Sequence, residues 1–354
     1  DQFCGNNLEN SIVSVDQTSD ATGTEVSDIS QVNFIEDMFQ FMTAVNDCDQ
    51  SGPGNNIANC ANSADDHIET ITQKNDGVAD QFTDIFQFNN VGFFQPMNLG
   101  NNCDETTFIA TGEDNIADCN NSAANAIGPV SQSNTATGQF DATVDQDNNA
   151  NATQNLVADN SCDGTGTNDA DCDNEAAVNN IVGITQTNSA DDELDAFSTQ
   201  FNNAVVDQNM VLLNDCDESD LGINVAFCEN FEPSNSIGSI TQTSSNTAGA
   251  EAVSATIAQS NDVQQITQNL QSINDCDEQG DSDNSAICTT SPDNSIQSIA
   301  QTNLANEVAD DFVQNNLIGV INQDLRTTND CDDTDADVVD DGTNDASCGN
   351  QIAN

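Results

Sequence analysis

Short apolar patches recur along this chain, and each of them ends in a glutamine. The pattern is clearest between Asn294 and Cys331, where three patches end at Gln301, Gln314 and Gln323. The cysteine that closes this stretch follows the third glutamine by eight residues. Because the same plan can be found six times, the pattern is typical of a repeat protein.

Six units and a terminal segment divide the chain. Each unit has an opening cysteine, three glutamines and a closing cysteine, always eight residues after the third glutamine. We expect a single repeat array over 1–354, and a terminal segment that restarts the repeat. The units are 1–48, 49–103, 104–162, 163–216, 217–276 and 277–331, and the terminal segment is 332–354. Six separate globular beads are the alternative, but bodies this small are marginal folds.

Patches of about seven residues suit strands better than helices. In the patch 11–17, alternation predicts one face that carries Val13 and Val15 and an opposite face that carries Ile12. Since both faces are apolar in every unit, we expect the strands to be covered on both sides. Pro129 lies inside one such patch and indicates a broken strand or an edge strand there.

Stacking of equivalent strands along one axis would order the whole chain. We therefore predict an all-β, repetitive stacked cross-β or β-solenoid-like array, with about three short strands in each unit of about 57 residues and disulfide-pinched loops. Equivalent glutamine amides would then hydrogen-bond along the stack, which satisfies polar groups that burial would otherwise leave unpaired. The predicted ladder consists of Gln17, Gln73, Gln132, Gln186, Gln242 and Gln301.

A serine precedes the first glutamine by six residues in three units, and an asparagine follows in two of them. The pairs are Ser11 and Gln17, Ser236 and Gln242, and Ser295 and Gln301. This spacing resembles the curlin repeat of curli-type functional amyloids, and the cysteine-containing plan is similar to amyloid-like archaeal cell-sheath proteins. The chain departs from the curlin pattern in its third patch, in its cysteine loops, and in units two to four, where the serine is replaced by His67, Ala126 and Asn180. The resemblance implies a stacked β architecture and a role in an extracellular matrix.

Thirteen cysteines without a Cys-x-x-Cys pair indicate an oxidising, extracellular setting. A zinc or iron–sulfur site would need closer spacing and more histidine than His67 alone, which we interpret as a surface or ladder substitution. Two disulfide patterns stay open. One closes the loops between units, with the pairs Cys48–Cys60, Cys103–Cys119, Cys162–Cys172, Cys216–Cys228, Cys276–Cys288 and Cys331–Cys348. The other closes each body, beginning with Cys4–Cys48 and Cys60–Cys103, and has the more uniform separations.

The last residues repeat the beginning of the first unit, since Cys348 and Cys4 are each followed by Gly-Asn. One interpretation is a cap, which solenoids commonly need. The other is an assembly end on which the next subunit stacks, because both ends would expose unpaired strand edges. Whichever of Cys4 and Cys348 remains after pairing is a candidate for an intermolecular disulfide.

Charge narrows the range of functions. The chain has 61 acidic and two basic residues and a net charge of −59, which argues against binding a nucleic-acid backbone and implies strong self-repulsion. No apolar run approaches the ~18 residues of a membrane span, and Asp at position 1 suggests a processed chain.

Asp333, Asp335 and Asp337 begin like a calcium loop, but the glycine and glutamate expected later in such a loop are missing. A Ca²⁺ site and a merely solvated acidic face both stay open, and no other cofactor is expected.

No catalytic motif can be recognised, so we do not expect an enzyme. We expect a secreted structural protein of the cell surface, which assembles head-to-tail or edge-to-edge with copies of itself into an amyloid-like filament or sheath. The alternative is a secreted acidic repeat module that binds cations or adheres to surfaces.

Overall fold

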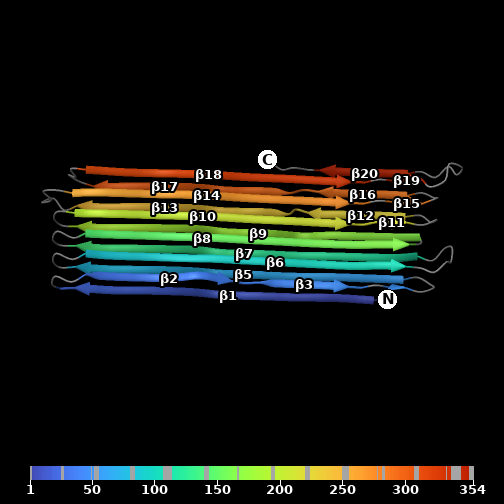
Figure 1. The fold of residues 1–354 in the computed structure, drawn as a ribbon, viewed down its shortest axis with the longest axis horizontal. Helices are drawn as coiled ribbons and strands as arrows, with labels where there is room; N and C mark the ends of the chain where they lie inside the picture. Colours follow the sequence, from blue (N-terminus) through green and yellow to red (C-terminus); the bar gives the residue numbers. More distant parts are fainter. Residues whose placement is uncertain are drawn as a thin grey trace.

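The structure is a flat stack of long strands that all run along the long axis of the molecule (Figure 1). In this computed structural model, the described residues are 2–24, 28–48, 50–51, 56–79, 84–106, 114–138, 143–165, 167–192, 196–219, 224–248, 255–276, 278–280, 284–306, 311–331, 333–335 and 344–350. The colours in Figure 1 run from blue at one end of the stack to red at the other, so the chain advances along the stack unit by unit. This confirms the expected all-β, repetitive stacked array.

Two sheets form the stack, and the strands within each sheet are parallel. Sheet A contains β1 (Gln2–Gly23), β5 (Asn56–Ala79), β7 (Asp114–Gly138), β9 (Thr167–Asp192), β12 (Asn224–Phe231), β13 (Ser234–Ala248), β16 (Asn284–Thr290), β17 (Asp293–Asn306) and β20 (Asn344–Asn350). Sheet B contains β2 (Ile29–Phe39), β3 (Met42–Asp47), β4 (Gln50–Ser51), β6 (Asp84–Thr106), β8 (Thr143–Thr165), β10 (Ala196–Asp215), β11 (Glu218–Ser219), β14 (Ala255–Asp275), β15 (Glu278–Gly280), β18 (Asp311–Asp330) and β19 (Asp333–Asp335).

Each unit makes one rung in sheet A and one in sheet B. In the second, third and fourth units each rung is a single long strand rather than several short ones, whereas some rungs of the other units are divided, for example into β2 and β3. The first patch lies in sheet A, whereas the second and third patches are joined in sheet B. In the second unit, for example, Gln87 and Gln95 both lie on the single strand β6. The second and third patches merge because polar residues between them, such as Asn89, are inward-facing and hydrogen-bonded, so they do not interrupt the strand.

Equivalent residues of successive units lie directly over one another. Ile12 pairs with Ile68 and Gln17 with Gln73 between β1 and β5, and the same correspondence continues through sheet A. Sheet B repeats this arrangement, for example with Gln200 opposite Gln259 between β10 and β14. Because the neighbouring strands of a parallel sheet are about 4.8 Å apart, each side-chain type forms a column along the stack.

The two apolar positions that recur in every first patch lie on the same inward face, which corrects the expectation of two covered faces, whereas Val13 and Val182 beside them are exposed. Ile68 and Ile71 are both buried in the central core, with exposed Glu69 and Thr70 between them. Two consecutive outward residues at this irregularity shift the alternation by one, so both isoleucines point into the space between the sheets. Among the described residues, no element covers the outer faces of the two sheets.

Glycine and proline occupy this irregularity without ending the strand. A Cβ atom on Gly238 would lie 2.0 Å from the carbonyl oxygen of Val182, so the close approach of β13 and β9 requires glycine there. Pro129 pairs with Gly183 in the interior of sheet A, within the continuous strand β7. The expectation of a broken strand or an edge strand at Pro129 is therefore wrong. The register pairs between β5 and β7 skip Gly128 and Pro129, which shows that the missing N–H falls where the ladder is already interrupted.

Candidate functional site: side-chain columns and open ends

The six glutamines of the expected ladder form one column inside the stack. The Nε2 atom of each glutamine donates a hydrogen bond to Oε1 of the glutamine before it, from Gln73 to Gln17 at 2.8 Å through Gln301 to Gln242 at 2.9 Å. The same amides also donate across the interior, as Gln73 does to the carbonyl oxygen of Asn90 at 2.9 Å. Each ladder therefore joins neighbouring rungs and also binds sheet A to sheet B.

Two further glutamine columns run through sheet B. Gln87 donates to Gln31 at 2.8 Å and Gln95 to Gln40 at 2.9 Å, and both series continue to the last rung. These glutamines were recognised as markers of the second and third patches. Their alignment follows from the same repeat spacing.

Columns of asparagine are the feature that sequence reasoning missed. Near the cysteines, Asn62 in sheet A and Asn101 in sheet B are joined at 2.8 Å, and each also bonds to the equivalent asparagine of the next rung. A second pair of asparagine columns, which includes Asn75 in sheet A and Asn89 in sheet B, is joined in the same way across the interior and along the stack. The signal was present, because asparagine stands two residues after most opening cysteines and two before most closing ones.

The cysteines also form a column between the two sheets. Four of the loop disulfides are present, namely Cys103–Cys119, Cys162–Cys172, Cys216–Cys228 and Cys276–Cys288. Cys331 is disulfide-bonded as well, whereas the side chain of Cys348 lies outside the described residues. The expected pair Cys48–Cys60 is wrong, because Cys48 is bonded to Cys4 as in the body-closing pattern. The reason is that stacking offers Cys48 sheet A cysteines from two successive rungs.

One carboxylate interrupts an amide column. Asp66 occupies the position that asparagine holds in the other units, and it is fully buried. Asn125 donates to Asn179 at 3.0 Å in the same column, but Oδ1 of Asn125 and both carboxylate oxygens of Asp66 have no hydrogen-bond partner. Burial, together with the nearby Asp65 carboxylate and against an opposing effect of His67, raises the pKa of Asp66 to about 7.

Acidic side chains also gather on the outer face of sheet A. Burial and, after it, neighbouring carboxylates that include Asp118 and Glu229 raise the pKa of Asp171 to about 6 and that of Asp173 to about 7. The pKa of Asp118 is raised for the same two reasons. Protons or other cations would relieve the mutual repulsion of these groups.

The acidic residues proposed for calcium are only partly covered by the structure. The backbone of Asp333 and Asp335 forms β19, but their side chains, like Asp337 as a whole, lie outside the described residues. Beside the closing cysteines, Asp215, Asp275 and Asp330 stack in register and form an acidic row. His67 Nε2 lies 2.9 Å from the Ser11 hydroxyl, so this histidine takes part in a contact between two rungs.

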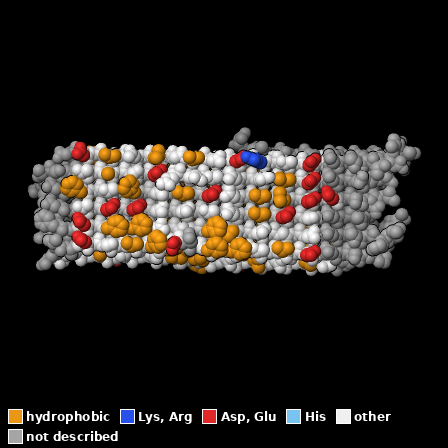
Figure 2. Space-filling view, in the orientation of Figure 1, with side chains coloured by type: hydrophobic (Ala, Val, Ile, Leu, Met, Phe, Trp, Pro, Cys, Tyr) orange, Lys and Arg blue, Asp and Glu red, His pale blue; other side chains and the backbone are white. Residues whose placement is uncertain are grey.

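Core positions become exposed where the stack ends. Ile318 and Ile321 of β18 are each 46% exposed, although Val263 and Ile266, their partners on β14, are fully buried. Among the described strands, β1, β2 and β3 at one end and β17 and β18 at the other pair on one side only. Figure 2 shows other exposed hydrophobic groups towards the N-terminal end of sheet B, where the aromatic residues include Phe34, Phe39, Phe41 and Phe86.

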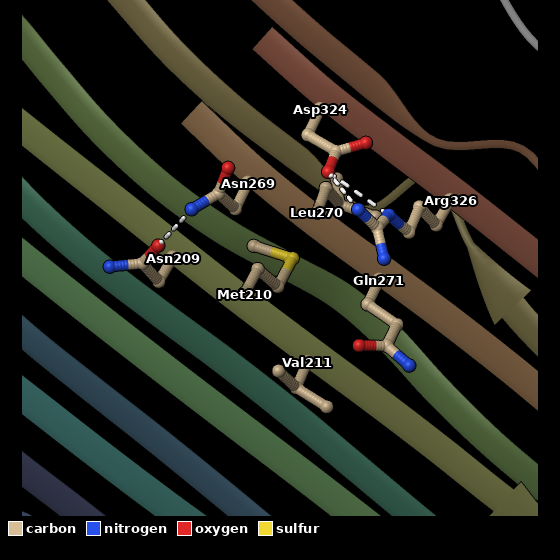
Figure 3. A pocket seen from close by; sticks show the side chains of 8 residues that line it. All are labelled: Asn209, Met210, Val211, Asn269, Leu270, Gln271, Asp324 and Arg326. Atoms are coloured by element: carbon tan, nitrogen blue, oxygen red, sulfur yellow. Dashed lines mark hydrogen bonds and ion pairs between the residues drawn. The ribbon is translucent and has the colours of Figure 1, made fainter. Parts of the chain in front are cut away.

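A small surface pocket lies over β10, β14 and β18 (Figure 3). Asn269 donates to Asn209 at 2.8 Å across it, and Arg326 is bound to Asp324 with an NH2-to-Oδ2 distance of 2.7 Å. Met210 and Leu270 supply its apolar floor. These side chains are held by their own column neighbours and form no reactive constellation.

A scan against protein-family models, a search of curated proteins and a search of solved structures found no match. Within the described residues, no helix has the length and apolar character needed to cross a membrane.

Proposed function

We propose that this chain is an extracellular structural protein whose copies stack head-to-tail into an amyloid-like filament or sheath. The observation that carries this proposal is the exposure of core positions on the last rung. Phe312, Ile318 and Ile321 are about half exposed in β18, whereas the corresponding residues of β14 are buried. Covering three half-exposed side chains of this size would stabilise a contact by about 3 kcal/mol in total.

The direction of the glutamine ladders makes the two open ends complementary. Each glutamine donates toward the N-terminal end and accepts from the C-terminal side. A following copy would therefore direct the amide donor of its Gln17 toward Oε1 of Gln301. Asparagine columns such as Asn62 to Asn121 donate in the opposite direction, and they too match head-to-tail but not head-to-head. A heterologous contact that repeats in one direction produces a filament.

Net charge sets the conditions for this assembly. A chain with a charge of −59 repels its copies, and repulsion between surface charges falls with added salt. We therefore propose assembly at high ionic strength, at mildly acidic pH or with bound cations. The disulfides fit an oxidising location outside the cell, and the resemblance to curlin repeats and to cell sheaths fits the same role.

A second candidate function is that of a secreted cation-binding module. The acidic cluster on sheet A, which includes Asp118, Asp171 and Asp173, supports it, because burial and, after it, neighbouring carboxylates raise the pKa values of these groups. The two candidates differ in what cations would do. A binding module would take up Ca²⁺ and stay monomeric, whereas a structural protein would polymerise in any concentrated salt that screens its charge.

The test is Gln17→Glu. The new carboxylate still accepts the hydrogen bond from Gln73, so the fold of the monomer is kept, but the donor to Gln301 of the preceding copy is lost and a charge is placed in the contact. An uncompensated buried charge costs about 3 kcal/mol, which raises the critical concentration for polymerisation about 100-fold. The control is Thr22→Glu, which adds the same charge on the outer face of β1.

Polymer formation is measured by sedimentation and electron microscopy over a range of salt and Ca²⁺ concentrations. The proposal predicts filaments from the unmodified chain and from Thr22→Glu, and few from Gln17→Glu. Equal critical concentrations for the two variants would contradict head-to-tail stacking. A chain that binds Ca²⁺ and remains monomeric under every condition would support the cation-binding module instead.

A further inference from the structure

The cysteines form one buried column of sulfur atoms along the stack. In sheet A, Cys4, Cys60, Cys119, Cys172, Cys228, Cys288 and Cys348 occupy the same register position in successive rungs. The cysteines that close the units meet them from sheet B, and disulfides cross the interior with Cα–Cα distances of 6.3 to 6.7 Å. The cysteines from Cys48 to Cys288 are fully buried, whereas Cys4 and Cys331 near the two ends are partly buried.

Sulfur atoms in this column have more than one neighbour within reach. The Sγ atom of Cys60 lies within 4.8 Å of both sulfurs of the Cys103–Cys119 disulfide. The Sγ atom of Cys276 likewise lies within 4.8 Å of both sulfurs of Cys216–Cys228. A cysteine from one rung is therefore placed beside the disulfide of the next. Such proximity of a sulfur to a disulfide is a requirement of thiol–disulfide exchange.

The structure contains both directions of pairing. Cys4–Cys48 joins the two ends of one unit, whereas Cys103–Cys119 and the disulfides after it join successive units. The change from one pairing pattern to the other falls at Cys60, which lies between Cys4 and Cys119 in the column. Since both patterns occur in one column, neither is imposed by the fold.

The number of cysteines adds a constraint. Sheet A supplies seven cysteines to the column, and the other six of the thirteen close the units from sheet B. Disulfides that cross the interior can therefore use only six of the seven sheet A cysteines. The direction of pairing decides which sheet A cysteine keeps a thiol, and the column makes all seven positions structurally equivalent.

We propose that the cysteine column is a thiol–disulfide exchange path, along which the extra thiol moves between sheet A cysteines and becomes open to modification at Cys4. In each step, a sheet A thiolate attacks the sheet B sulfur of a neighbouring disulfide. One S–S bond forms and one breaks, and the sheet A sulfur that is released takes up the proton that the attacking thiol lost. The step needs no oxidant or reductant.

The chemical class of the partner follows from the end position. A partly buried thiol at the open edge of β1 can react with an external disulfide or another soft electrophile, whereas the fully buried sulfurs cannot. The path would deliver a reactive thiol to the end of the stack although most sulfurs are shielded. This inference concerns the single chain and does not depend on polymerisation.

A matched pair of variants tests whether both directions of pairing are accessible. Cys228→Ala removes a sheet A cysteine, and Cys216→Ala removes the sheet B cysteine to which it is bonded. If pairing can reverse, Cys228→Ala re-pairs completely, with Cys60 bonded to Cys103, and holds no thiol. Cys216→Ala then holds two. If the pairs are fixed as in the structure, both variants hold two thiols, which would overturn the proposal. Thiols are counted in denaturant after oxidative folding.

Movement of the thiol is tested on the unmodified chain. Monomeric native protein is treated with a maleimide at pH 8, quenched in acid, and mapped by mass spectrometry without reduction. The proposal predicts label on Cys4 and a new Cys48–Cys60 disulfide in place of Cys4–Cys48. A map that retains Cys4–Cys48, with label elsewhere or with none, would overturn it even if the variants fold poorly.

Discussion

Replacement of Asp66 by asparagine should stabilise the protein, and the gain should depend on pH. Asp66 is the carboxylate in an otherwise amide column, and Oδ1 of Asn125 above it accepts no hydrogen bond. An asparagine at this position can donate to Asn125 as Asn125 donates to Asn179. The substitution therefore supplies the missing donor and removes a buried charge.

The magnitude follows from the pKa of Asp66, which burial raises from 3.8 to about 7 in the folded state. A group with a raised folded pKa binds more protons when folded, so the free energy of unfolding decreases as pH rises from about 4 to about 7. The shift of about three pKa units sets an upper limit of about 4 kcal/mol. Structural relaxation around the buried charge reduces this to about 2 kcal/mol. The restored hydrogen bond adds about 1 kcal/mol.

The assay is guanidinium unfolding followed by far-UV circular dichroism, since the chain has no Trp or Tyr. We expect Asp66→Asn to stabilise by about 3 kcal/mol at pH 8 and by about 1 kcal/mol or less at pH 4, where the wild-type acid is neutral. The control is Asp16→Asn, an exposed acid on the neighbouring strand β1. Equal gains at both pH values, or equal gains for the two variants, would refute this reasoning.

Two further predictions concern the backbone and the last strand. Gly238→Ala should destabilise the protein by at least 2 kcal/mol, because the new Cβ would lie 2.0 Å from the Val182 carbonyl oxygen. The control is Gly100→Ala, whose Cβ would have its nearest neighbour at 3.9 Å, and which should change the unfolding midpoint little. Removal of 344–354, which includes β20, should lower the critical concentration for polymerisation, because β20 covers the part of β16 on which the first residues of the next β1 would stack. An unchanged critical concentration would contradict this prediction, and a higher one would assign β20 to the assembly contact instead.

The stacked architecture could be predicted because the regular spacing of the glutamines and cysteines was sufficient to indicate it. Gln17 and its five equivalents recur at matched positions, and a polar residue that returns at a buried place in every unit requires a partner of its own kind. The number of strands was harder to predict. Buried asparagines such as Asn89 look like loop residues in the sequence, yet their amides are satisfied by columns that exist only once the rungs are stacked.

Two errors have a common physical origin in how neighbouring rungs meet. The faces assigned to Ile12 and Val15 were wrong because simple alternation does not anticipate two consecutive outward residues in mid-strand. The Cys48–Cys60 pair was wrong because sequence separation does not distinguish partners that stacking places within similar reach. Asp66 carried a signal that could have been used, since it is the acid at a position where the other units have asparagine.

X-ray fibre diffraction from oriented assembled material tests the central claim most directly. If copies continue the stack without a break, the meridian should carry a reflection near 4.8 Å, and six strand spacings should give an axial repeat of about 29 Å per copy. Filaments that lack the 4.8 Å meridional reflection, or that place it on the equator, would contradict the account.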